Sequence, residues 1–187
     1  MGHDGHDGHD GHEHHHHHHD EKPHEHHRAS APASVSAFVI TCSDTRDGAS
    51  DGGGPLIVKL LEQAGHSVVG NDVVKDDAVA IRDAIEHGYA HGARVIILTG
   101  GTGFAPRDVT VETVTPLLDK QMPGFGELFR MLSFQEIGPA AMLSRAVAGT
   151  SQRMAIFALP GSPKAIELAM KRLILPELGH LVRELLR

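Results

Sequence analysis

The sequence predicts an α/β domain with a mainly parallel sheet and helices on both faces. β-rich segments alternate with segments of helical periodicity, polar or glycine-rich loops follow the strands, and 40% of the residues are hydrophobic. Strands that alternate with helices are joined by right-handed crossovers, which keep the strands parallel. We place this domain at residues 35–187, after a His-rich tail and linker at residues 1–34.

The first strand and helix are predicted within residues 35–65. Residues 35–42 (VSAFVITC) are rich in β-formers, Cys42 is expected to pack at the strand end, and Asp, Ser and Gly dominate residues 43–54. A helix is expected from Pro55, which a first helical turn accepts, to Gly65. Its apolar stripe consists of Leu56, Leu60, Leu61 and Ala64.

Two further strands are predicted at residues 67–74 and 94–98, and both are followed by polar loops. The helix between them ends at Gly92. His87 and His91 have i, i+4 spacing on this helix, but the H-E-x-x-H order is missing, so we expect surface residues. The helical spacing is carried by Ala78, Ile81, Ile85 and Tyr89.

The rest of the domain contains a predicted helix near residues 109–120, a second helix, a strand at residues 154–159 and a last helix. Ser162 is a suitable N-cap for the last helix, and Pro163 is a suitable first residue. The apolar faces consist of Phe125, Leu128, Phe129 and Leu132 in the second helix and of Ile166, Ala169, Met170 and Leu173 in the last.

The N-terminal tail differs from the domain in composition. Of the 17 histidines, 13 lie in the first 27 residues, among Gly-His-Asp repeats and a run of six histidines. No apolar residue follows Met1 before Ala29, so the tail cannot offset the roughly 1 to 2 kcal/mol per residue that ordering a backbone costs. We expect disorder. Clustered imidazoles can bind Ni²⁺ or Zn²⁺, although a solvated polar tail explains the composition equally well.

Charge and cysteine content exclude several classes of protein. Residues 1–30 hold seven acids and two bases, net −5, which leaves about −2 of the formal −7 to the rest of the chain. Neither part resembles a nucleic-acid-binding surface. A single Cys excludes a disulfide scaffold, and the chain has no run of 18 apolar residues and no apolar secretory signal. We therefore expect a cytoplasmic protein without a membrane partner.

Two loops are candidate anion-binding sites. The first consists of Thr99, Gly100, Gly101, Thr102 and Gly103, where glycines let backbone N–H groups turn toward one point. The second, Gly161, Ser162, Pro163 and Lys164, opens a helix beside a lysine charge. A tight strand exit and an ordinary helix cap are the structural alternatives. Ligands of such sheets bind beyond the carboxyl ends of the strands, so two anion sites there suggest a ligand with several phosphates.

Acidic residues lie among these donors, at Asp44, Asp47, Asp51, Asp76, Asp77 and Asp108. Mg²⁺ held by one or two carboxylates would reconcile acids with phosphates, because the ion bridges and neutralises phosphate oxygens. For Asp76, Asp77 and Asp108, capping of the following helix is the alternative. No pattern supports a protein nucleophile.

These motifs, taken together, resemble the MoaB/MogA family of molybdenum cofactor biosynthesis. The resemblance extends from Val35 to about Leu186, and residues 129–138 and 144–149 are similar to the MoaB branch in particular. The motifs occur in order along the domain. They are Ser43-Asp44-Thr45-Arg46, Asp51, the loop at residues 99–103, Asp108, Gly124-Phe125-Gly126-Glu127 and residues 160–165.

The resemblance implies a domain that binds molybdopterin and transfers the adenylyl group of Mg²⁺-bound ATP to the terminal phosphate, releasing pyrophosphate. Asp76 and Asp108 match the aspartates implicated in this transfer, with Mg²⁺ held by one or the other. It also implies a homotrimer or homohexamer and a partner that inserts molybdate. A non-catalytic molybdopterin-binding oligomer stays open as the alternative. The ligand-binding matches are Ser43, Asp51, residues 99–103 and 161–164 and, more weakly, Glu127, Ser133 and Ser144.

Overall fold

The computed structural model describes residues 1–2, 32–43 and 52–187. The predicted disorder of the His-rich tail, its metal binding, and the loop that contains Asp44, Asp47 and Asp51 lie outside these residues. Within the described part of the chain, no helix is both long enough and apolar enough to cross a bilayer.

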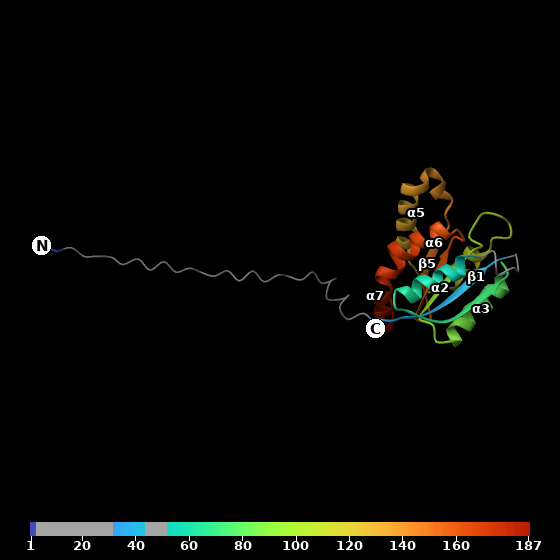
Figure 1. Cartoon of the computed structure of the whole chain (residues 1–187), viewed down its shortest axis with the longest axis horizontal. Helices are drawn as coiled ribbons and strands as arrows, with labels where there is room; N and C mark the ends of the chain where they lie inside the picture. The colour runs from blue at the N-terminus through green and yellow to red at the C-terminus, as the bar shows by residue number, and fades with distance from the viewer. Residues whose placement is uncertain (3–31, 44–51) are drawn as a thin grey trace.

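One sheet forms the centre of the domain, with helices packed around it (Figure 1). It has six strands, in the order β2-β1-β3-β6-β5-β4. β1 (Ser36–Cys42) pairs in parallel with β2 (Ser67–Val74) and with β3 (Val95–Thr99), and β3 pairs in parallel with β6 (Met154–Leu159). The predicted parallel sheet is therefore confirmed. Its carboxyl edge carries the loops that follow β1, β2, β3 and β6.

The sheet continues through two antiparallel strands that the sequence analysis did not predict. β5 (Val147–Ser151) forms a hairpin with β6, and β4 (Lys120–Gln121) pairs with β5. The hairpin turn places Gln152 at φ 48° and Arg153 at φ 65°, a conformation that Asn and Gly usually provide. With neither residue at the turn, the usual sequence signal of a two-residue hairpin is absent.

Helices cover both faces of the sheet because the central strands are apolar on both sides. In β1, Val39 belongs to one buried cluster, whereas Phe38 and Ile40 belong to the other. The first cluster involves α2 (Gly53–Gln63), α5 (Pro123–Ile137), α6 (Pro163–Ala169), a π-helical turn η3 (Met170–Ile174) and α7 (Leu175–Leu186). The second involves α3 (Ala78–Ala90) and α4 (Thr110–Val114).

Three predictions about helices are wrong in detail. α2 begins at Gly53, before Pro55, although Pro55 lies within its first turn as expected. The helix predicted at residues 109–120 ends at Val114 and continues only as a short 3-10 turn, η1 (Thr115–Leu117), since Pro116 has no N–H for a helical hydrogen bond. In α5, Leu128 is 48% exposed and does not share the buried face of Phe125 and Phe129.

Candidate functional site

The glycine loop, residues 99–103, leaves β3 at the carboxyl edge of the parallel strands. Gly100 and Gly101 have φ values of 94° and 61°, and a side chain at Gly100 would collide with the backbone oxygen of Cys42. Thr99 Oγ1 donates to the backbone oxygen of Pro160 at 3.2 Å. The turn therefore requires its glycines sterically, and it is tied to the loop that follows β6.

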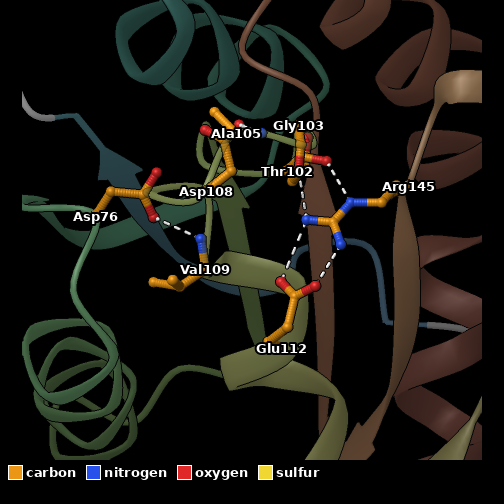
Figure 2. Close-up of polar contacts among 8 residues, drawn as sticks. All are labelled: Asp76, Thr102, Gly103, Ala105, Asp108, Val109, Glu112 and Arg145. Carbon is orange, nitrogen blue, oxygen red and sulfur yellow. Dashed lines mark hydrogen bonds and ion pairs between the residues drawn. The ribbon is translucent and has the colours of Figure 1, made fainter.

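Asp76 is directed toward this loop, whereas its neighbour Asp77 is not. Asp77 caps α3, since its Oδ1 accepts hydrogen bonds from the N–H groups of Val79 and Ala80, both at 3.0 Å. Asp76 Oδ1 accepts instead from the N–H of Val109 at 3.3 Å (Figure 2). Asp76 is half-buried, and the cap predicted for this pair of acids belongs to Asp77 alone.

Asp108 approaches the same loop from its other end. Its Oδ2 accepts from the N–H of Ala105 at 2.8 Å, so it closes the turn before it in sequence instead of capping α4 (Figure 2). A side chain at Gly101 would collide with both carboxylate oxygens of Asp76, and one at Gly103 would place its Cβ 2.6 Å from Asp108 Oδ2. The two glycines thus leave the space that the two carboxylates occupy.

The loop after β6 approaches the glycine loop closely. A Cβ at Gly161 would lie 3.6 Å from the Cα of Gly100. Ser162 Oγ accepts from the N–H of Ala165 at 3.3 Å and caps α6, with Pro163 in its first turn, as predicted. Lys164 is exposed.

A pocket of about 450 Å³ lies between these two loops and the helix α5. Ser133 is buried in it, and the hydroxyl of Ser144 is buried with no hydrogen-bond partner within the described residues. The wall does not include Asp76 or Asp108, which contact the glycine loop from outside the pocket. The wall consists of Gly100, Gly101, Thr102, Gly103, Phe129, Ser133, Ile137, Ala140, Leu143, Ser144, Arg145, Pro160, Gly161, Ser162 and Ala165.

The other candidate residues that the structure describes lie outside this pocket. Pro163 and Lys164 line an adjoining hollow, and Glu127 lines a smaller one beside β4. Ser43 follows β1, and its N–H donates to the backbone oxygen of Val74 at 2.9 Å. Asp51 lies outside the described residues.

Arg145 is a residue of the pocket wall that sequence reasoning missed. It forms an ion pair with Glu112 of α4, and its hydrogen bonds lower the pKa of Glu112 because they stabilise the charged carboxylate. An arginine in a loop is usually solvated, so the sequence carries no signal for this contact. The apolar wall from Phe129, Ile137 and Leu143 was also missed, because apolar residues at helical spacing predict an ordinary core face.

Comparisons with known proteins show which family this chain is similar to. Residues 38–180 match the model of a family described as "Probable molybdopterin binding domain". A protein of Bacillus cereus named "Molybdenum cofactor biosynthesis protein B" is 49% identical over 163 residues, which cover 86% of this chain and 96% of that protein.

Two solved structures are similar in fold as well as in sequence. A crystal structure of a molybdenum cofactor biosynthesis protein B has a TM-score of 0.80 and 50% identity and covers 84% of this chain and 99% of that chain. The tungsten cofactor synthesizing protein MoaB from Pyrococcus furiosus has a TM-score of 0.77 and 36% identity, with 84% of this chain and 100% of that chain covered.

Proposed function

This chain belongs to the MoaB family of molybdenum cofactor biosynthesis proteins, and we propose that it binds molybdopterin and adenylylates its terminal phosphate with ATP. The observation that carries this proposal is the position of Asp76 and Asp108 against one glycine loop at the carboxyl edge of the sheet. Two half-buried carboxylates beside backbone donors suit a reaction that joins two phosphorylated molecules.

The carboxylates of Asp76 and Asp108 fit Mg²⁺. The described residues contain no group of three or more His, Cys, Asp or Glu that would hold a metal on their own. Mg²⁺ is commonly bound through one or two carboxylates together with substrate phosphates and water, and Asp76 or Asp108 would supply these carboxylates. When bound, the ion neutralises charge on the phosphate oxygens during displacement.

The residues of the chain would act mainly by positioning the two substrates. The pocket beside the glycine loop would bind molybdopterin, with its apolar wall excluding water and the loop amides orienting phosphate. An oxygen of the molybdopterin phosphate forms a bond to the α-phosphorus of ATP while the bond to pyrophosphate breaks, and pyrophosphate leaves with the electron pair. No protein nucleophile is required.

A second candidate function is a non-catalytic molybdopterin-binding oligomer, which one observation favours. The pocket wall contains glycine, serine, threonine, apolar residues and Arg145 but neither aspartate, so it could hold a ligand without presenting those carboxylates to it. Anaerobic calorimetry separates the two functions. Molybdopterin binding with ATP consumption in the presence of Mg²⁺ supports the transferase, whereas binding of molybdopterin without nucleotide turnover supports the binder.

The proposed assembly is a homotrimer or homohexamer, and the proposed partner is the protein that inserts molybdate. α5 and the 3-10 segment after it, η2 (Gly138–Leu143), expose an apolar surface that supports self-association. In Figure 1, α5 lies at the upper end of the domain. The exposed residues of this apolar surface are Leu128, Met131, Phe134, Ile137, Met142 and Leu143.

The His-rich tail remains a candidate Ni²⁺ or Zn²⁺ site.

A further inference from the structure

Arg145 lies between the glycine loop and α4 and bonds to both (Figure 2). Its Nε donates to the backbone oxygen of Thr102 at 3.0 Å, and its Nη2 donates to the backbone oxygen of Gly103 at 2.5 Å. Its side chain is only 20% exposed. The guanidinium therefore holds two consecutive carbonyls of the loop.

Holding two carbonyls also determines where the neighbouring amides point. In a trans peptide unit the C=O and the following N–H point in opposite directions. With the oxygens of Thr102 and Gly103 turned toward Arg145, the N–H groups of Gly103 and Phe104 point away from it. Asp108 contacts Gly103 from the side opposite Arg145 (Figure 2).

Glu112 fixes the orientation of the arginine. Both of its carboxylate oxygens accept from the guanidinium, Oε1 from Nη1 and Oε2 from Nη2, the latter at 3.2 Å. The ring of Phe104 lies 5.0 Å from the guanidinium carbon. All three guanidinium nitrogens of Arg145 thus donate hydrogen bonds within the protein. This distinguishes Arg145 from an arginine whose donors are available to bind a phosphate.

We propose that Arg145 is a positioning residue, which holds the glycine loop through the carbonyls of Thr102 and Gly103, with Glu112 as the counter-ion that orients it. The proposal extends the proposed function, since it assigns the residue on which the geometry of the ligand-binding loop depends. A lysine cannot replace it, because a single ammonium lacks the planar fork that bonds two carbonyls and a carboxylate together.

Two variants and one matched control test this role. Arg145→Lys keeps the charge and loses the fork, and Glu112→Gln keeps the shape and loses the counter-ion. Arg187→Lys changes another arginine paired with a glutamate, Glu184 at 3.0 Å, far from the loop in sequence. The measurements are deuterium exchange of a peptide covering residues 99–104, anaerobic molybdopterin affinity, and thermal unfolding.

We expect the variants at Arg145 and Glu112 to change the glycine loop and its ligand binding without changing the rest of the domain. Arg145→Lys accelerates exchange of the loop peptide about tenfold or more, weakens molybdopterin binding about tenfold, and reduces any pyrophosphate release by on the order of 100-fold. Glu112→Gln has the same effects to a smaller degree, and Arg187→Lys has none. Exchange in the peptides of β1 and β3 stays unchanged in all three variants.

Three results would overturn the role. Loop exchange equal to that of the unaltered chain shows that Arg145 does not position the loop. Weaker binding without faster exchange shows that Arg145 contacts the ligand directly, and acceleration in every peptide shows a general loss of stability. If the unaltered chain binds no molybdopterin, the proposed function fails, and the loop exchange of the variants still decides the role of Arg145.

Discussion

The carboxylate of Asp76 accepts a hydrogen bond from the backbone N–H of Val109 at 3.3 Å. This bond joins the loop after β2 to the residue that directly follows Asp108, so the two acids proposed for catalysis are linked through adjacent backbone. Thr110 N donates to the backbone oxygen of Gly101 at 3.0 Å, which ties the same segment to the glycine loop. Displacing one part of this arrangement is therefore expected to disturb the others.

The neighbours Asp76 and Asp77 provide a matched pair of variants. Asp76→Asn is expected to reduce adenylyl transfer by orders of magnitude with little change in the melting temperature, because it removes a charge beside the loop. Asp77→Ala is expected to cost about 1 kcal/mol of stability through the lost cap, with turnover unchanged. Steady-state kinetics and thermal unfolding of both variants check this. Equal kinetic losses in the two variants would show that Asp76 has no specific role.

Gly101→Ala is expected to abolish turnover, because a methyl group there would collide with the carboxylate of Asp76. Gly92→Ala is the control, since Gly92 has a similar backbone conformation at φ 74° but has open space around it. Gly92→Ala should lose about 1 to 2 kcal/mol from backbone strain alone, and Gly101→Ala should lose more because of the collision, both measured by urea unfolding. Retained turnover in Gly101→Ala would mean that Asp76 is not held where the reaction requires it.

His66 makes stability depend on pH near neutrality. Its Nδ1 accepts from the N–H of Val35 at 3.3 Å, which requires the neutral ring, and burial lowers its pKa from the ordinary value of 6.5. The unfolded chain then binds a proton more readily than the folded chain. Stability is therefore full above pH 6.5 and falls as the pH decreases through the lowered pKa.

The measurement is the free energy of unfolding in urea between about pH 5 and pH 8. The comparison is between the unaltered chain and His66→Asn, so that contributions of the other histidines cancel. The variant should lose part of the pH dependence in the acidic half of the range. Identical pH profiles would assign the dependence to other groups.

Phe134→Asp is expected to weaken the proposed oligomer, because Phe134 is 59% exposed within the apolar surface of α5 and η2. Burying an unpaired carboxylate in an interface is strongly unfavourable. Val79→Asp is the control, since Val79 is 61% exposed but lies on α3, outside that surface. Light scattering of both variants and of the unaltered chain measures the mass. An unaltered chain that is already monomeric would refute the assembly, and an unchanged mass for Phe134→Asp would refute this surface as its interface.

The parts of the fold that could be predicted are those with a strong local pattern. β1, β2, β3 and β6 are apolar segments that lead into polar loops, and their order along the chain identifies a parallel sheet. The same pattern placed the loops containing Asp76, Gly101 and Asp108 at one edge. β5 and β4 were missed because β5 is interrupted by Gly149, β4 has two residues, and their hairpin turn uses Gln152 and Arg153.

The parts of the site that could not be predicted depend on contacts between distant segments. Arg145 reaches Thr102 across 43 positions, and nothing near Arg145 in the sequence indicates that partner. Phe129 has the spacing of an ordinary core residue, and it lines the pocket only because α5 packs beside the glycine loop. Asp76 and Asp77 were equivalent in sequence as candidate helix caps, and only the folded backbone assigns the cap to Asp77.

Pyrophosphate release under anaerobic conditions with molybdopterin, ATP and Mg²⁺ tests the central claim most directly. The unaltered chain should release pyrophosphate well above background, and Asp108→Ala should reduce the rate by orders of magnitude while molybdopterin affinity changes little. A known active adenylyltransferase is the control for the reagents. No release from the unaltered chain, with that control active, would contradict the claim that these aspartates and this loop perform adenylyl transfer.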